Sequence, residues 1–335
     1  MTTVFDEVST GTKTLTIGQA VNRALADELA ADERVMLQGE DIGALGGVYR
    51  VTEGLAARFG SDRVVDAPLG ESGIVGTSIG LAQAGFIPVA EIQFDGFVYP
   101  AFDQIVSQLA KMHSRFQGHQ TFPVTIRLPY GGGIGSVEHH SESPEAYFAH
   151  TAGLKVVTYS NAHDAYWVTR AAIQSADPVM LLEPKKHYFV RGQVDFDSPL
   201  NNSYATVEAR SGTDATLLAW GPQVATALAA AEAGVDDGYD LQVLDIRGLS
   251  PLDMATISDA VTATGRAVVV HESSVFAGFG AEISAGLMEQ TFLSLEAPVQ
   301  RVGGYHMPYP PSQLEQDYLP TVDRVLDAVD ETFTY

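Results

Sequence analysis

Residues 64–80 of the chain read VVDAPLGESGIVGTSIG, and this stretch indicates the fold class. The run 64–66 is β-rich, and the apolar pattern that follows predicts a helix over 72–84. Glu71 lies between them, so its carboxyl would sit past the end of a strand and at the start of a helix. Short strands and helices alternate in this way along the chain, which predicts an α/β protein with mostly parallel sheets flanked by helices.

The same pattern predicts the other elements. In the first half, helices are expected at 17–30, 100–116, 144–150 and 162–176, and strands at 35–38, 87–93, 124–128, 155–159 and 179–183. In the second half, strands are expected at 215–220, 241–245 and 267–271. An Ala-rich helix is expected to follow the first of these strands and to end at 233, and further helices are expected at 253–264, at 281–290 and near 322–333. The irregular, polar stretch 184–214 reads as a connection or an edge hairpin. At 335 residues the chain is expected to form two domains, 1–195 and 205–335.

Composition excludes several classes of function. The chain carries 42 acidic and 19 basic side chains, a net charge of −23 that disfavours nucleic acid and anionic membranes as partners. It contains no cysteine, which excludes disulfides, thiolate metal sites and cysteine nucleophiles. No apolar run is long enough to span a membrane, and the N-terminal MTTVFDEVST lacks the features of a signal or transit peptide. A cytoplasmic protein is expected.

The glycine-rich motifs do not match the common nucleotide-binding patterns. The runs 131–133 and 278–280 fit neither the dinucleotide fingerprint nor the P-loop. The run 76–80, GTSIG, has the spelling of a nucleophile elbow, but Ser78 falls inside a helical pattern instead of on a strand-to-helix turn. A hydrolase built on Ser78 is kept as a rival interpretation. Ser72, Gly76, Gly80 and Ala84 instead form a stripe of small residues that lets another element approach the helix closely.

A histidine pair follows the first glycine-rich turn. Glu138, His139 and His140 are adjacent on a turn and point in different directions, which disfavours a metal site. His140 precedes Ser141-Glu142-Ser143-Pro144, a helix-start signal, and it follows a strand. Ligand sites of α/β folds lie past the carboxyl ends of strands, so His140 is a candidate functional residue.

Taken together, these segments resemble the β subunit of the decarboxylating first component of 2-oxoacid dehydrogenase complexes, a transketolase-like family. The likeness covers essentially the whole chain and includes APLGESGIVGTSIG (67–80), AEIQFDGFVYPAFDQIV (90–106), HHSESPEAYFAHTAGLKVV (139–157), LLEPK (181–185), LLAWG (217–221), HESSVFAGFGAEI (271–283) and EAPVQRVGGY (296–305). The resemblance implies a pyrimidine-binding domain followed by a C-terminal transketolase-type domain.

The resemblance also implies roles for single residues. Glu71 would hydrogen-bond the aminopyrimidine ring of thiamin diphosphate, Leu69, Gln93 and Phe97 would line that pocket, and His140 would be the active-site histidine. Some relatives carry a stabilising potassium ion at the positions that match Val124, Thr125, Ala172, Ser175 and Asp177. A glutamate that shares a proton with the pyrimidine ring would help the cofactor to lose a proton from its thiazolium carbon.

The family's Gly-Asp-Gly pattern for magnesium and diphosphate is missing from this chain. The resemblance therefore implies an α₂β₂ heterotetramer in which the α subunit holds magnesium and the diphosphate. SPEAYFAH and EAPVQRVGGY look most like the branched-chain subfamily, so the expected reaction is oxidative decarboxylation of a branched-chain 2-oxo acid and acyl transfer to the lipoyl group of a dihydrolipoyl acyltransferase core. Pyruvate and acetoin dehydrogenases are the nearest alternatives, and a noncatalytic binding subunit is a further one.

Overall fold

The computed structural model describes residues 10–335. The first nine residues lie outside this range, and with them most of the N-terminal stretch in which no signal peptide is expected. The described chain divides into two compact units, one made of residues 10–129 and 151–203 and the other of residues 130–150 and 204–335. Within the described residues, no helix is long and apolar enough to cross a membrane.

A parallel sheet forms the centre of the first unit. Its neighbouring strands are β6 (Lys155–Thr158), β7 (Val179–Pro184), β5 (Thr125–Tyr130), β4 (Ile87–Glu91), β2 (Val35–Gly39) and β3 (Val64–Asp66), in that order. The strand pairs β2–β3, β2–β4, β4–β5 and β6–β7 are all parallel. The carboxyl ends of β2, β3 and β4 therefore meet at one edge of the sheet, where ligand sites of such folds lie.

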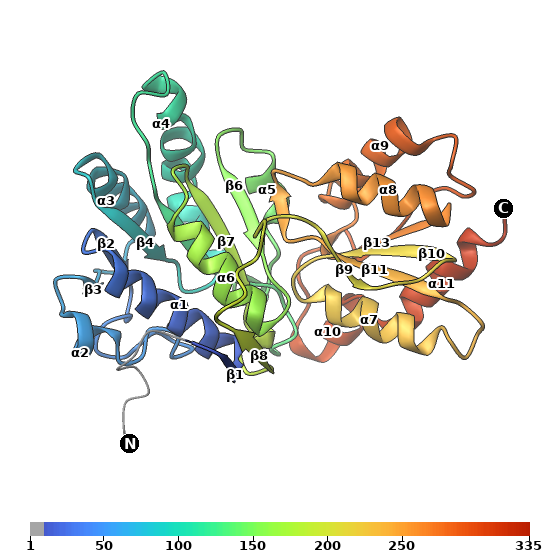
Figure 1. The fold of residues 1–335 in the computed structure, drawn as a ribbon, viewed down its shortest axis with the longest axis horizontal. Helices are drawn as coiled ribbons and strands as arrows, with labels where there is room; N and C mark the ends of the chain where they lie inside the picture. Colours follow the sequence, from blue (N-terminus) through green and yellow to red (C-terminus); the bar gives the residue numbers. More distant parts are fainter. Residues whose placement is uncertain (1–9) are drawn as a thin grey trace. The chain divides into compact units, whose positions relative to one another are not determined.

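Helices and short segments complete the first unit: α1 (Ile17–Ala31), α2 (Leu55–Phe59), α3 (Glu71–Gln83), α4 (Ala110–Arg115) and α6 (Ala162–Ile173). Helix α1 begins with a capping box, in which Thr16 Oγ accepts the Gln19 amide at 3.1 Å and Gln19 Oε1 accepts the Thr16 amide at 3.0 Å. Helices α1 and α6 lie side by side (Figure 1). A two-stranded antiparallel ribbon joins β1 (Thr12–Thr16) to β8 (Arg191–Asp195).

The second unit contains a five-stranded sheet with the order β14 (Gln300–Gly304), β13 (Ala267–Ser274), β10 (Ala215–Ala219), β11 (Leu241–Asp245) and β9 (Val207–Arg210). Only β9 in this sheet is antiparallel to its neighbour. Helices α7 (Gln223–Ala233) and α11 (Val322–Thr332) cover one face, and α8 (Met254–Thr264) and α9 (Gly280–Thr291) cover the other (Figure 1). The unit also holds β12 (Gly248–Ser250), α5 (Glu145–Ala149) and α10 (Glu315–Tyr318).

The expectation of an α/β fold with mostly parallel sheets flanked by helices is confirmed, and most of the expected elements are present. The helix expected at 100–116 is wrong in detail, because that stretch is a 3₁₀ helix (η1, Asp95–Ala101), a π-helical segment (η2, Gln104–Leu109) and the short α4. Pro100 lies inside the 3₁₀ helix. The sequence pattern also missed β1, β14 and α10, which are short and pair or pack with partners far away in sequence.

Candidate functional site

Glu71 is the first residue of α3, and its side chain is partly exposed. The preceding residue, Gly70, donates its amide to Glu40 Oε1 at 3.1 Å. Glu40 directly follows β2, and Glu71 lies five residues beyond the end of β3. Two carboxylates from adjacent strand ends therefore flank the start of one helix, where the helix dipole favours negative charge.

Glu40 was not among the residues that the sequence singled out. Burial raises the pKa of its carboxyl, the Gly70 amide opposes that rise, and the nearby charges of Glu71 and Asp41 add to it. Its position just after β2 could have revealed it, since the same argument from strand ends identified Glu71.

Gln93 and Phe97 lie past the end of the third neighbouring strand, β4. Gln93 Nε2 donates to the Glu40 carbonyl at 3.3 Å and to Asp41 Oδ2 at 3.2 Å, so the amide is anchored to the loop after β2. Phe97 meets Phe94 edge to face, with ring centroids 5.9 Å apart. Helix α3 packs on the 3₁₀ helix that carries Phe97. The unit thus brings Gln93 and Phe97 to the same sheet edge as Glu71.

A buried ion pair fixes this 3₁₀ helix. Lys185 donates to Asp95, the first residue of the helix, and both side chains are fully buried. A buried charge left without its partner is costly, so the pair holds the segment in one place. The ion pair with Asp95 explains why Lys185, the last residue of LLEPK, can be buried.

The fourth expected pocket residue, Leu69, is 86% exposed. Nothing lies within 4 Å of a Cβ placed at Gly70, Gly73 or Gly80. Of the two glycines in the small-residue stripe, Gly80 has open space beside it and Gly76 lies against Gln104, so part of the stripe is uncovered in the described chain.

The donor set fits the pyrimidine end of thiamin diphosphate. Glu71 carries a carboxyl that could pair with a ring nitrogen, and Leu69 and Phe97 carry apolar surface that could pack on a flat ring. The same site carries the carboxylates of Glu40, Asp41 and Glu71, which would repel a diphosphate. Among the described residues, this sheet edge therefore suits half of the cofactor.

His140 belongs to the second unit, where it ends a 3₁₀ turn, Glu138–His140, and is partly buried. Its ring lies beside that of His139, with centroids 4.6 Å apart. His139 Nδ1 is 3.7 Å from Glu138 Oε1. Within residues 10–335, no group of three or more His, Cys, Asp or Glu side chains is arranged to hold a metal ion.

The residues expected to hold potassium lie close together in the first unit. The Val124 carbonyl accepts the Val179 amide at 2.9 Å, and the Ala172 carbonyl accepts the Ser175 amide at 3.2 Å. Lys155 Nζ is 3.0 Å from Ser175 Oγ and 3.1 Å from Asp177 Oδ2. The Lys155 ammonium therefore contacts a side-chain oxygen of two of these residues.

Ser78 lies in the interior of α3 and is fully buried. Its hydroxyl donates to the Ile74 carbonyl at 3.0 Å and accepts from Gln38 Nε2. The strand-to-helix turn of a nucleophile elbow is not present here, and the contacts are those of a serine that ties α3 to β2.

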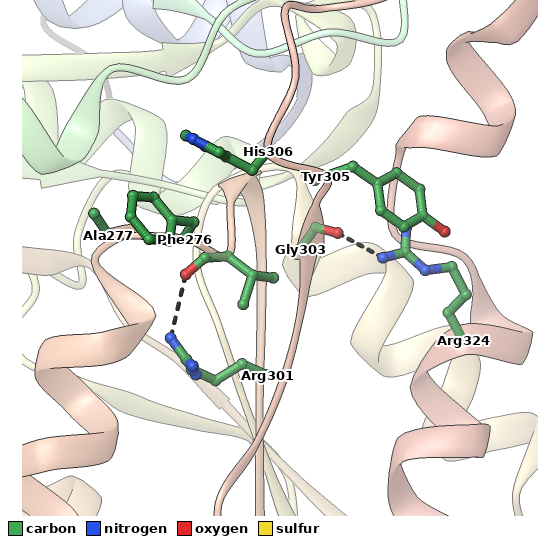
Figure 2. A pocket seen from close by; sticks show the side chains of 9 residues that line it. Phe276, Ala277, Arg301, Gly303, Tyr305, His306 and Arg324 are labelled. Carbon is green, nitrogen blue, oxygen red and sulfur yellow. Dashed lines mark hydrogen bonds between the residues drawn. The ribbon is translucent and has the colours of Figure 1, made fainter.

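A separate cavity of about 470 Å³ opens in the second unit. Figure 2 shows Phe276 and His306 next to one another in its lining, with ring centroids 4.4 Å apart, and the Arg324 guanidinium beside the Tyr305 ring. Arg324 Nη2 donates to the Gly303 carbonyl at 2.6 Å, and Arg301 Nη1 to the Val275 carbonyl at 3.2 Å. None of the residues expected to bind cofactor lines this cavity.

Two family models and several relatives match the chain. The family model of the transketolase pyrimidine binding domain matches residues 13–190, and that of the transketolase C-terminal domain matches residues 203–325. The chain is 52% identical to the pyruvate dehydrogenase E1 component subunit beta of Leifsonia xyli, covering 96% of each chain. It is 53% identical to the 3-methyl-2-oxobutanoate dehydrogenase subunit beta of Mycobacterium tuberculosis, covering 96% of this chain and 93% of that one.

A solved structure of a split-gene transketolase, an inactive β4 tetramer, shares the fold with a TM-score of 0.79 and 21% identity, covering 96% of this chain and 98% of that one. The family models and the two relatives extend over nearly the whole sequence. The chain therefore belongs to the family of E1 β subunits of thiamin-diphosphate-dependent 2-oxoacid dehydrogenases.

Proposed function

We propose that the chain, joined to an α subunit, catalyses the oxidative decarboxylation of a branched-chain 2-oxo acid and the transfer of the acyl group to a lipoyl domain. The observation that carries this proposal is the position of Glu71, at the start of α3 and at the sheet edge where Gln93 and Phe97 also lie. That edge suits the pyrimidine half of the cofactor.

When bound, thiamin diphosphate would supply a nucleophilic carbon for the 2-oxo group and an electron sink for the pair that loss of carbon dioxide leaves on the substrate. Glu71 would hold a proton on the pyrimidine ring nitrogen, which promotes proton loss from that carbon. Leu69 and Phe97 would keep water away from the shared proton, and an apolar surrounding strengthens such a hydrogen bond. Aspartate would be too short to reach the ring.

His140 would orient the substrate or deliver a proton during acyl transfer. Histidine suits this role because its ordinary pKa lies near neutral pH. We expect His140→Ala to lower kcat of the reconstituted enzyme at least about tenfold. Unchanged turnover would support the noncatalytic alternative.

An α subunit would supply the diphosphate and magnesium site in an α₂β₂ heterotetramer. The exposed Leu69 and the open space beside Gly73 and Gly80 support a partner over this face. Purified alone, the chain should bind no thiamin diphosphate in a calorimetric titration, because its own carboxylates repel the diphosphate. Stoichiometric binding and turnover by the chain alone would overturn this part of the proposal.

The branched-chain preference rests on SPEAYFAH and EAPVQRVGGY. The relatives include a pyruvate and a 3-methyl-2-oxobutanoate enzyme at nearly equal identity, so substrate is the question to test. The chain should be co-expressed with its α partner, and kcat/KM compared for pyruvate and 3-methyl-2-oxobutanoate. We expect the branched-chain acid to be preferred; a preference for pyruvate would assign the alternative activity.

We also propose a cytoplasmic location and a dihydrolipoyl acyltransferase core as the acyl acceptor. Potassium would bind at Val124, Thr125, Ala172, Ser175 and Asp177, chiefly through backbone oxygens, and it would compete there with the Lys155 ammonium. Comparing thermal unfolding in KCl and NaCl at equal ionic strength tests this site. An equal Tm in the two salts would count against it.

A further inference from the structure

The segment 131–150, which carries His140, is bound within the second unit by carboxylates of that unit. The Gly132 amide donates to Glu272 Oε1, and the Gly133 amide donates to Glu315 Oε1 at 2.8 Å. The Gly135 amide donates to Glu315 Oε2 at 3.1 Å. Backbone amides of one glycine-rich turn therefore donate to two different carboxylates of the second unit.

The two carboxylates are themselves well fixed. Glu272 lies in β13 and is 5% exposed, while Glu315 begins α10 and is 4% exposed. The Tyr309 hydroxyl donates to Glu315 Oε1 at 2.7 Å, and a Cβ at Gly132 would overlap that hydroxyl. Hydrogen bonds to a charged acceptor are stronger than neutral ones, so the glycine-rich turn is held firmly.

A third attachment holds the far side of His140. Ser273 Oγ donates to Glu145 Oε1 at 2.7 Å, and Glu145 is the first residue of α5. His271 Nδ1 lies 3.1 Å from Ser273 Oγ. Glu145 and His271 are both fully buried.

The imidazole of His271 is enclosed on several sides. The Trp220 ring stacks on it, with centroids 5.2 Å apart and planes at 7°. A Cβ at Gly278, Gly280 or Gly303 would come within 3.0 Å of the imidazole. Gly278, Gly280 and Gly303 therefore leave room for this buried histidine, which lies against the Ser273 side chain.

We propose that Glu272, Ser273 and Glu315 are positioning residues that fix the loop carrying His140 to the second unit. This inference rests on the role proposed for His140. The loop lies within the residues matched by the pyrimidine binding domain model, yet its anchors come from β13 and α10, in the residues matched by the C-terminal domain model. The C-terminal domain would therefore set the position of a histidine that the sequence assigns to the other domain.

Hydrogen–deuterium exchange in the full chain, followed by mass spectrometry of peptides from 131–150, tests the positioning directly. Ser273→Ala is paired with Ser274→Ala, because Ser274 Oγ instead accepts the Phe276 amide at 3.2 Å. Glu315→Gln is paired with Asp317→Asn, an exposed residue of the same short helix. We expect Ser273→Ala and Glu315→Gln to speed exchange in 131–150 about tenfold and the controls to leave it unchanged.

Steady-state kinetics of the same variants in the reconstituted enzyme then connect the loop to function. Ser273→Ala should lower kcat more than it raises KM, and Ser273→Thr, which keeps the hydroxyl, should restore kcat. If Ser273→Ala and Glu315→Gln match their controls in exchange, the positioning inference is wrong, even if His140→Ala is inactive. If they speed exchange but His140→Ala is fully active, the proposed role of His140 fails and the attachment of the loop stands. If Glu315→Gln does not fold, the serine pair decides.

Discussion

Replacing Glu145 with glutamine should change how the stability of the second unit depends on pH. Burial raises the pKa of this carboxyl from 4.5 to about 7. Hydrogen bonds from Ser273, from its own backbone and from Trp220 oppose the rise, while the charge of Glu272 adds to it. A group whose pKa is raised on folding stabilises the fold fully below its unfolded pKa, and that contribution is lost as pH rises toward the folded pKa.

The size of the effect follows from the shift. A change from 4.5 to about 7 corresponds to about 3 kcal/mol in total, and about 2 kcal/mol of it falls between pH 5.5 and 8. Glutamine has nearly the same shape and never ionises. As pH rises from 5.5 to 8, the free energy of unfolding of the unmodified chain should therefore fall by about 2 kcal/mol relative to that of Glu145→Gln.

Urea denaturation at several pH values between 5.5 and 8 measures this difference. Tryptophan fluorescence is a suitable probe, because Trp220 lies in the second unit beside Glu145. The difference in free energy of unfolding between the variant and the unmodified chain should increase with pH and level off above pH 7. Parallel curves across the whole range would refute the reasoning, since they would mean that Glu145 titrates alike in the folded and unfolded chain.

Three further substitutions test other parts of the structure. Gly80→Ala should raise the free energy of unfolding of the isolated chain by about 1 kcal/mol in urea denaturation, because Gly80 lies in an exposed part of α3 with open space around it. The same substitution should weaken association with the α subunit, measured by sedimentation. Lys185→Met should cost about 3–5 kcal/mol in the same urea assay, because it removes the ammonium that faces the buried Asp95; a loss below 1 kcal/mol would contradict this. Gly153→Ala should lower the free energy of unfolding by about 2 kcal/mol or more, since φ is +93° and the added Cβ would overlap the Ala110 carbonyl; an unchanged Tm would show that the backbone adjusts freely.

The fold could be predicted because its signals are local. Short β-rich runs and a helical pattern locate β2, β3 and α3, and the polar residues at the ends of these strands point to the edge of the sheet where Glu71 lies. The stretch 100–116 was harder, since Pro100 and the π-helical turn depend on packing against α3. Helical composition alone does not distinguish these geometries.

The attachment of the His140 loop could not have been predicted from the pattern. Gly133 and Glu315 are 182 residues apart, and Glu145 and Ser273 are 128 apart. No local signal links such pairs, because each residue reads separately as an ordinary loop glycine, serine or acid. Only the folded chain shows that the glycine-rich turn binds carboxylates of the protein and that the glycines after β13 enclose a histidine.

The central claim is that Glu71 activates the cofactor from its place at the start of α3. The most direct test is the rate at which the C2 proton of thiamin diphosphate exchanges with D₂O when the cofactor is bound to the reconstituted complex, followed by quenching and NMR. Glu71→Gln should slow this exchange at least about tenfold while the exposed control Glu53→Gln leaves it unchanged. Equal exchange rates in Glu71→Gln and the unmodified complex, with the cofactor fully bound in both, would contradict the claim.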